Sequence, residues 1–193
     1  MQLKRIHHVA YRCRDAKETV EFYQRVLGMD FVLAIAEDKV PSTGAPDPYM
    51  HVFMDAGMGN VLAFFELPNS PEMGFDGNTP DWVQHIAFEL QDMAALLAAK
   101  ESLEQRGLEV IGPTDHGIFQ SIYFRDPNGY VIELTAKKPN HDEMMDPSTN
   151  GAREKLAAWQ AGKTDAADHP IAKAASENNR ALAAFCEECR RMG

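Results

Sequence analysis

Two histidines and two glutamates recur along this sequence in a pattern that suits a metal ion. His8 lies in the stretch RIHHVAYRC and His85 in VQHIAFEL, while Glu66 and Glu133 stand near the ends of two later apolar stretches. Imidazole nitrogen and carboxylate oxygen are ligands that divalent transition metals accept together. A buried carboxylate needs a cation or paired charge beside it, so the two pairs together predict one divalent metal site.

An internal repeat is the reason to treat the pairs as one site. The segments HVAYRCRDAKETVEFYQRVLG and HIAFELQDMAALLAAKESLEQRG align from His8 and His85, and Asp15 and Asp92 each follow seven residues later. Each segment predicts a strand and then a helix, which the aspartate caps and a glycine ends. A further strand and a hairpin, over residues 49–67 and 121–135, complete each copy. The fold class predicted is α+β, with paired β-α-β-β-β modules.

Strand alternation predicts which side chains share a face, because successive side chains point to opposite sides. In the second module Ile86 and Phe88 face the helix, so His85 and Glu133 share the other, concave face. In the first module Tyr11 faces the helix and His8 points away, whereas His7 is left out of the site. In the last strand of that module we expect Val61, Ala63, Phe65 and Leu67 toward the helix, and Asn60, Leu62, Phe64 and Glu66 on the concave face.

Composition and charge exclude several classes of function. The formal net charge of −10 argues against binding to nucleic acid or to an anionic membrane surface. No apolar run approaches the roughly 18–20 residues that span a bilayer, and the N-terminal residues lack a secretory signal. Three cysteines indicate a reducing compartment, so we expect a cytoplasmic protein. An acidic body attracts an anionic substrate only if it holds a cation.

At these residues the sequence resembles the vicinal oxygen chelate superfamily, which includes glyoxalase I, bleomycin resistance proteins, extradiol dioxygenases and epimerases. The segments HVAYRCRDAKETVEFYQRVLGM and YFRDPNGYVIELT carry the resemblance, which covers residues 5–136. It implies that the modules form an open cup around one divalent metal. The implied ligands are His8, His85 and Glu133, with Glu66 as a fourth candidate. It also implies a small-molecule substrate with vicinal oxygens.

A second pattern favours ring-cleaving chemistry. The segment TDHGIFQSIYFRDPNGYVIE fits the extradiol dioxygenase signature, and His116 and Tyr123 take the positions of its histidine and tyrosine. A catechol must lose a proton on binding iron, and bound oxygen needs a hydrogen-bond donor. Ring-cleaving relatives generally have a further catalytic histidine where this chain has Asn60. We expect Asn60 to take this catalytic position beside bound oxygen, where it can donate a hydrogen bond but cannot relay a proton at neutral pH. His51 on the neighbouring strand is a substitute whose facing is left open.

Whether Glu66 binds the metal decides how many coordination positions remain for substrate, and so which of two reactions the site could catalyse. Three protein ligands leave an octahedral metal three positions, enough for a bidentate catecholate and O₂. Four protein ligands leave two, as in the isomerisation catalysed by glyoxalase I-like lyases or epimerases. We expect the dioxygenase with Fe(II), the lyase being the alternative and Mn, Zn or Ni other metals. A non-catalytic binding protein is a third class, whose members typically lack these ligands. Leu62 and Phe64 are expected to contact substrate.

The remaining segments are expected to support these modules. The modules span residues 1–67 and 83–136, with a Pro/Gly-rich connector over 68–82 and a linker with a helical tail over 137–193. In the tail we expect helices over 151–162 and 170–192. The second has an apolar stripe that would pack on the body or on another subunit, and a homodimer is the assembly expected. Cys186 and Cys189 are given neither a metal nor a redox role.

Overall fold

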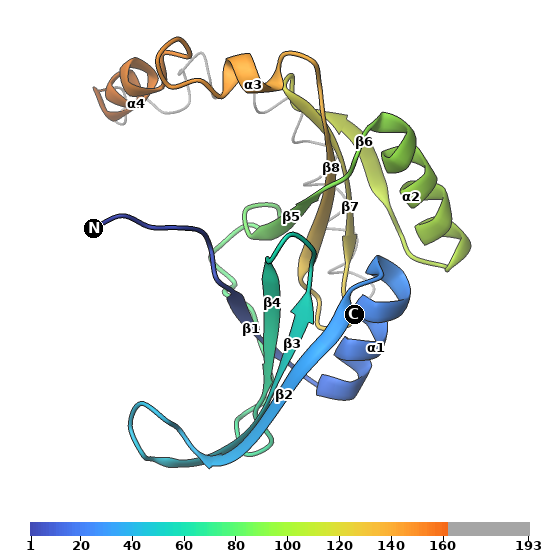
Figure 1. Ribbon diagram of the computed structural model, residues 1–193, viewed down its shortest axis with the longest axis vertical. Helices are drawn as coiled ribbons and strands as arrows, with labels where there is room; N and C mark the ends of the chain where they lie inside the picture. Colours follow the sequence, from blue (N-terminus) through green and yellow to red (C-terminus); the bar gives the residue numbers. More distant parts are fainter. Residues whose placement is uncertain (162–193) are drawn as a thin grey trace. The chain divides into compact units, whose positions relative to one another are not determined.

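The computed structural model describes residues 1–161 and divides into two compact units (Figure 1). The first unit contains residues 1–77 together with residues 126–130, and the second contains residues 78–125 and the described residues from 131. Each unit has one four-stranded sheet with a helix against it, and each follows the order β-α-β-β-β. The predicted α+β class and its repeated module are therefore confirmed.

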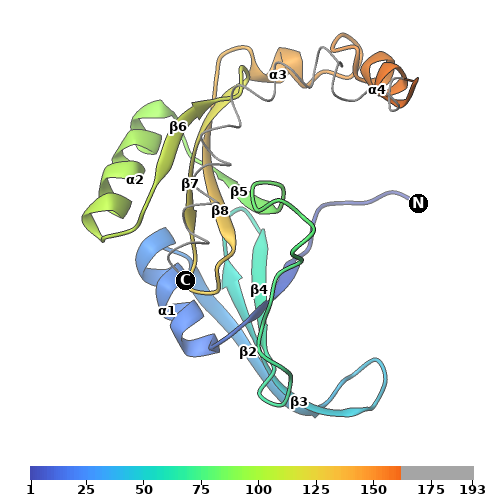
Figure 2. The same cartoon turned by 180° about the vertical axis from the view of Figure 1, so that it is seen from behind.

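The first unit is a mixed sheet in the strand order β1-β4-β3-β2. Strands β1 and β4 run parallel, and the other neighbours are antiparallel. Its helix packs against β2, β3 and β4. Figure 2 shows from behind that the helix lies along one face of this sheet. The elements are β1 (Val9–Cys13), α1 (Ala16–Leu27), β2 (Asp30–Lys39), β3 (Pro46–Asp55) and β4 (Val61–Glu66).

The second unit repeats this arrangement in the order β5-β8-β7-β6, again with its first and last strands parallel. The strand that follows its helix begins only at Ile111, although the apolar segment LEVIG starts at Leu108. The reason is that the Leu108 amide still donates to the Leu103 carbonyl and so closes the preceding helix. The elements are β5 (His85–Glu89), α2 (Met93–Gln105), β6 (Ile111–Asp115), β7 (Phe119–Arg125) and β8 (Val131–Lys137), followed by α3 (His141–Met144) and α4 (Ala152–Ala161).

The predicted caps position both helices. The Asp15 carboxylate accepts from the Glu18 amide at 2.7 Å, and Gly28 ends α1 with a φ of 67°. In the second unit the Asp92 carboxylate accepts from the Ala95 amide at 2.9 Å. Each cap satisfies an amide that has no partner within the helix.

The core of the first unit corrects one predicted strand face. Phe64 is fully buried, and its ring centroid lies 5.0 Å from that of Tyr23 on α1. Leu62 is only 1% exposed and shares this side. In β4 the even-numbered residues therefore face the helix, which is the reverse of the prediction. The parallel register that places Tyr11 opposite Phe64 is consistent with this, since Tyr11 was correctly assigned to the helix side.

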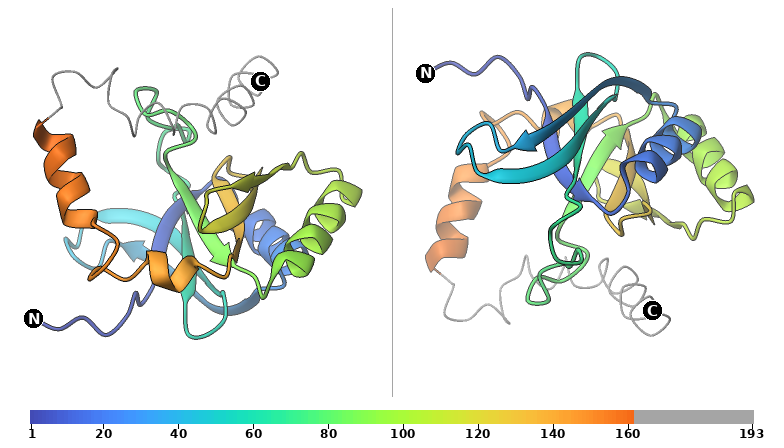
Figure 3. Two further views of the ribbon diagram at one scale, coloured as in Figure 1. Left: turned by 90° about the horizontal axis from the view of Figure 1, so that it is seen from above. Right: turned by 90° about the horizontal axis from the view of Figure 1, so that it is seen from below.

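The chain beyond β8 adds helices that bury none of their side chains. Helix α4 matches the helix predicted over residues 151–162, and α3 was not predicted. Both follow the end of β8, and α4 lies apart from the sheet of the second unit (Figure 3). The helix predicted over residues 170–192 lies outside the described residues. Within residues 1–161 no helix combines the length and the apolar character needed to cross a membrane.

Candidate metal and proton-transfer site

A histidine–glutamate pair lies at the centre of the second unit. The parallel strands β5 and β8 place His85 opposite Val131 and Ala87 opposite Glu133. The side chains of His85 and Glu133 therefore lie on the same face of the sheet. His85 Nε2 lies 3.0 Å from Glu133 Oε2. Glu133 is only 3% exposed, although it carries a carboxylate. The predicted pairing of His85 with Glu133 is therefore present in the structure.

The contact between His85 Nε2 and Glu133 Oε2 needs a proton or a metal ion between the two atoms. The pKa of His85 is raised mainly by the hydrogen bond with Glu133, and to a smaller extent by a ring N–H that is directed at the Trp82 backbone carbonyl. Because Nε2 faces Glu133, the nitrogen that donates to Trp82 is Nδ1. A neutral His85 would then point a lone pair at a carboxylate oxygen. The contact is favourable only when Nε2 carries a proton or both atoms bind a metal.

Tyr123 and His116 extend the pair into a chain of hydrogen bonds. The Tyr123 hydroxyl donates to Glu133 Oε1 at 3.1 Å, and His116 Nε2 lies 2.7 Å from the same hydroxyl oxygen. A phenol has one hydroxyl proton. Since Tyr123 uses it toward Glu133, His116 must donate to Tyr123 and so carries its proton on Nε2. The chain therefore runs from His116 through Tyr123 to Glu133.

The electrostatics of the chain keep Glu133 ionised. Burial alone would raise the pKa of Glu133. The hydrogen bond with His85, the nearby Ser121 hydroxyl, the charge of His85 and the hydrogen bond from Tyr123 together outweigh burial, so the pKa is lowered. The pKa of Tyr123 is raised, first by burial and then by the neighbouring Glu133 charge. The pKa of His85 is raised, mainly by its hydrogen bond to Glu133. Tyr123 therefore stays protonated next to an ionised carboxylate.

The pair fits two adjacent ligands of a divalent metal. Two atoms bound at about 2.1 Å to one ion and at right angles lie about 3.0 Å apart, as Nε2 and Oε2 do here. The Trp82 carbonyl on the far side of the imidazole is the type of partner that orients metal-binding histidines. Among residues 1–161 no three His, Cys, Asp or Glu side chains are gathered closely enough to hold a metal ion. His85 and Glu133 are therefore the two candidate ligands in the second unit.

The first unit places the remaining histidines on the sheet face away from α1. His8 comes just before β1 and is exposed, and its Nδ1 lies 2.8 Å from that of His7. His51 on β3 stacks on Phe65, with ring centroids 3.6 Å apart. Burial and then the charge of His8 lower the pKa of His51. Its position opposite Phe65 answers the question that the sequence left open about its facing.

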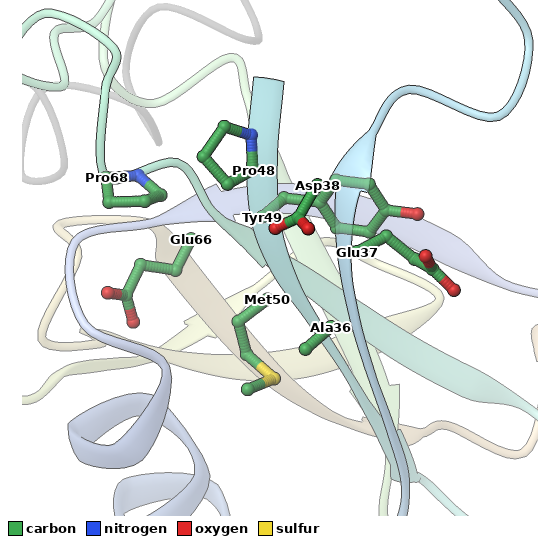
Figure 4. A pocket seen from close by; sticks show the side chains of 8 residues that line it. All are labelled: Ala36, Glu37, Asp38, Pro48, Tyr49, Met50, Glu66 and Pro68. Atoms are coloured by element: carbon green, nitrogen blue, oxygen red, sulfur yellow. The ribbon is translucent and has the colours of Figure 1, made fainter. Parts of the chain in front are cut away.

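Four predicted residues of the first unit lie elsewhere than expected. Leu62 and Phe64 are core residues against α1, so their predicted contact with substrate is wrong. Glu66 lies on the same helix side, where its Oε2 accepts from the Ala16 amide at 2.6 Å. Figure 4 shows its side chain directed toward the start of that helix. Asn60 belongs to the turn before β4, where its side-chain amide donates to the Gly57 carbonyl.

Glu66 also lines a pocket of about 320 Å³ in the first unit (Figure 4). The polar groups of this pocket are three carboxylates and one phenol, and it contains no histidine. It therefore lacks the donor set of the His85–Glu133 pair, and we do not assign the predicted chemistry to it. Its lining residues are Ala36, Glu37, Asp38, Pro48, Tyr49, Met50, Glu66 and Pro68.

Two supporting groups were missed at the sequence level. Ser121 is fully buried and lowers the pKa of Glu133. It stands two residues before Tyr123, so strand alternation alone would have placed it on the same face. The Trp82 backbone carries no such signal, because its hydrogen bond depends on how the chain enters β5.

Comparison with known proteins gives the family. The model for the glyoxalase, bleomycin resistance protein and dioxygenase superfamily matches residues 5–134. Lactoylglutathione lyase of Pseudomonas aeruginosa is 26% identical over 149 residues, which cover 69% of this chain and 83% of that protein. A Bacillus subtilis protein provisionally named as the ring-cleaving dioxygenase MhqA is 25% identical over 159 residues. Those residues cover 81% of this chain but only 48% of the Bacillus protein.

Solved structures support the same fold. The trypanothione-dependent glyoxalase I of Leishmania major is 21% identical, with a TM-score of 0.55 over 80% of this chain and 99% of that one. A glyoxylase/bleomycin resistance protein/dioxygenase domain from Frankia is 19% identical, with a TM-score of 0.56 over 71% of this chain and all of that one. At these identities the likeness establishes the fold alone. With the family model matching most of the chain, this protein belongs to the glyoxalase/bleomycin resistance protein/dioxygenase superfamily.

Proposed function

We propose that this chain is a divalent-metal-dependent dioxygenase that cleaves the ring of a catechol-like substrate next to its two hydroxyl groups. The observation that carries the proposal is the hydrogen-bonded chain His116–Tyr123–Glu133–His85 in the second unit. It joins two metal-binding groups to a phenol and an imidazole that can move a proton. The family contains dioxygenases and lyases, so the choice between these two activities rests on the residues of this site.

His85 and Glu133 are the proposed ligands from the second unit, and His8 stays the predicted third ligand on the basis of the sequence repeat. When bound, Fe(II) would supply a binding point for both substrate oxygens and the electron transfer that O₂ requires. The donor set of imidazole and carboxylate suits this ion, and Mn, Zn and Ni share the same preferences.

His116 and Tyr123 are proposed to handle protons during the reaction. A catechol gives up a proton when it binds as a chelate, and ring opening later needs a proton at an oxygen atom. His116 Nε2–H donates to the Tyr123 hydroxyl, whose oxygen is thereby held beside Glu133. In this proposal the free ring nitrogen of His116 takes the proton that the catechol releases and later returns it to the ring-opening oxygen, while Tyr123 keeps its own proton on Glu133.

The placement of Glu66 supports three protein ligands over four. Its carboxylate is occupied by the Ala16 amide and lies on the helix side of β4. A lyase of the glyoxalase I type would need this carboxylate as a ligand or base. We therefore propose that Glu66 stays off the metal and serves the start of α1.

A lactoylglutathione lyase-like activity is the second candidate, because that relative matches along 83% of its own length. The two candidates use different substrates. A dioxygenase consumes O₂ in the presence of a catechol, and a lyase isomerises the thiohemiacetal formed with glutathione without consuming O₂.

The test compares two variants with both substrates. The full chain is purified without oxygen, loaded with Fe(II), and assayed for catechol-dependent O₂ uptake and for thiohemiacetal turnover. We expect O₂ uptake that falls by about 10²–10⁴-fold in His116→Phe, with metal content unchanged. Glu66→Gln should keep O₂ uptake within about threefold, since a glutamine oxygen can still accept from the helix amide. Thiohemiacetal turnover that Glu66→Gln abolishes, without O₂ uptake, would overturn the dioxygenase assignment.

A further inference from the structure

The residue proposed to deliver protons, His116, lies in a turn whose position must be fixed from outside. The turn joins β6 to β7 over residues 116–118, and connecting segments of this kind are the more mobile parts of a fold. Within the turn, the His116 amide donates to the Phe119 carbonyl at 3.0 Å, and the Asp115 carboxylate accepts from the Gly117 amide at 2.7 Å. These bonds shape the turn locally.

A second set of bonds comes from the segment just after β8. The Lys138 ammonium contacts both carboxylate oxygens of Asp115, at 3.1 and 3.0 Å. The Lys138 amide donates to the Ile118 carbonyl at 3.0 Å, and the Asn140 side chain donates to the Gly117 carbonyl at 3.3 Å. Residues on both sides of His116 are thus tied to one short segment.

From this geometry we propose that Lys138 and Asn140 are positioning residues for His116, forming a latch that holds its imidazole on the Tyr123 hydroxyl. Neither residue contacts the proton-transfer chain itself. They act through the backbone of the turn, which carries the imidazole that lies 2.7 Å from the Tyr123 oxygen. The inference deepens the proposed function and rests on it for its kinetic part.

The energetics explain why such a latch would affect the reaction more than the fold. Asp115 is exposed and Lys138 is about one-third exposed, and ion pairs of this kind contribute little to global stability. Proton transfer, in contrast, needs donor and acceptor within hydrogen-bond distance. A displacement of about 1 Å at a reacting group can lower a rate by about 10²-fold. Loosening the turn should therefore lower turnover while leaving the melting temperature almost unchanged.

The experiment compares the double variant Lys138→Gln/Asn140→Ala with two single changes. Lys137→Gln is the matched control, because Lys137 is the preceding residue and makes an equivalent ion pair with Glu89 at 3.1 Å. Lys138→Arg keeps the positive charge and should leave the position of the turn as in wild type. Each is made in the full chain, and thermal unfolding is measured for all four proteins.

The first readout is nitrogen NMR of the histidine rings in metal-free protein, with His116 assigned by its loss in His116→Phe. Wild type, Lys137→Gln and Lys138→Arg should show a single Nε2–H tautomer for His116. In the double variant the ring should average between its two tautomers, because the contact with Tyr123 is no longer held. A His116 signal identical to that of wild type in the double variant would refute the latch.

The second readout is catechol-dependent O₂ uptake with Fe(II). The double variant should lose about tenfold in kcat with KM changed by less than about twofold, and both single variants should match wild type. A kcat within twofold of wild type in the double variant would also count against the latch. If wild type consumes no O₂, the proposed function fails, and the NMR comparison still decides the inference because it needs neither substrate nor metal.

Discussion

At the scale of single residues, the most informative feature is how the protons of the second unit are arranged. His85 turns one nitrogen to the Trp82 backbone and the other to Glu133, while Glu133 receives the Tyr123 hydroxyl on its second oxygen. Each of the two Glu133 oxygens thus has a partner that fixes its position. Such a pre-formed pair is what a metal needs, because its ligands pay little ordering entropy on binding.

Replacing His85 tests the metal site most directly. His85→Ala removes one proposed ligand and leaves Glu133 buried with Tyr123 as its partner, so we expect the chain to fold but to lose stoichiometric metal. Metal content after dialysis against Fe(II) or Mn(II) measures this. His141→Ala is a matched control, since His141 lies 2.8 Å from the Asp142 carboxylate and so forms another histidine–carboxylate pair. Equal metal content in the two variants would contradict the site.

The pH dependence of metal binding follows from the same pair. The hydrogen bond with Glu133 raises the pKa of His85 above its ordinary 6.5, so below that raised pKa a proton occupies Nε2. A metal must displace this proton. Metal affinity should therefore fall as pH drops through the raised pKa and level off above it. Titrations with Mn(II) between about pH 5.5 and 8.5 measure this trend. An affinity independent of pH over this range would argue against Nε2 as a ligand.

Without metal, the pair should stabilise the fold within a limited window of pH. The contribution of His85, whose pKa is raised on folding, is present below about 6.5 and is lost as pH rises through the folded pKa. The contribution of Glu133, whose pKa is lowered, is present above about 4.5 and is lost as pH falls through the folded pKa. Metal binding becomes favourable near the upper limit of this window.

At the scale of elements, the strands show what alternation can and cannot predict. In β5 only one face is apolar, and the placement of His85 was correct. In β4 the sequence VLAFFE is apolar on both faces, so alternation alone does not say which face packs on the helix, and the predicted assignment of Glu66 to the concave face was wrong. The structure instead satisfies Glu66 with the Ala16 amide. A helix N-terminus is a partner for a carboxylate that strand periodicity cannot reveal.

The turn over residues 126–130 is a second element whose role the sequence did not show. Its motif predicts a hairpin turn, yet the turn belongs to the first unit, and Asp126 is 5% exposed there. One Asp126 oxygen accepts from the Asn128 and Tyr130 amides. The other accepts from the Tyr23 hydroxyl and the Asn128 side chain. All four partners are donors, so this site needs a carboxylate.

Asp126→Asn should therefore destabilise the first unit. An asparagine presents an amino group to donors and leaves at least one of them unsatisfied, which costs about 1–3 kcal/mol. Thermal or urea unfolding measures the loss, and hydrogen exchange should show faster exchange in α1, which carries Tyr23. Asp142→Asn, at an exposed position in α3, is the control and should change stability by less than about 0.5 kcal/mol. Equal unfolding midpoints for the two variants would contradict this account of the turn.

At the scale of the whole molecule, the repeat produced two units of identical strand order but unequal chemistry. The second unit contains the full chain from His116 to His85, and the first has His8 and His51 on one sheet face. The acidic excess that gives the net charge of −10 lies before residue 137, and the segment from 137 onward has equal numbers of basic and acidic residues. A bound cation would offset part of this excess.

Removing the chain after residue 140 tests whether the tail takes part in the chemistry. Within the described residues, α3 and α4 bury no side chain, and Leu156 is 69% exposed. The truncated chain keeps every proposed ligand and both latch residues, Lys138 and Asn140. We therefore expect unchanged metal affinity and an unchanged Nε2–H signal for His116, together with altered oligomeric state, stability or solubility. Light scattering, thermal unfolding and metal titration measure these separately. A folded truncated protein that no longer binds metal would place part of the tail in the site.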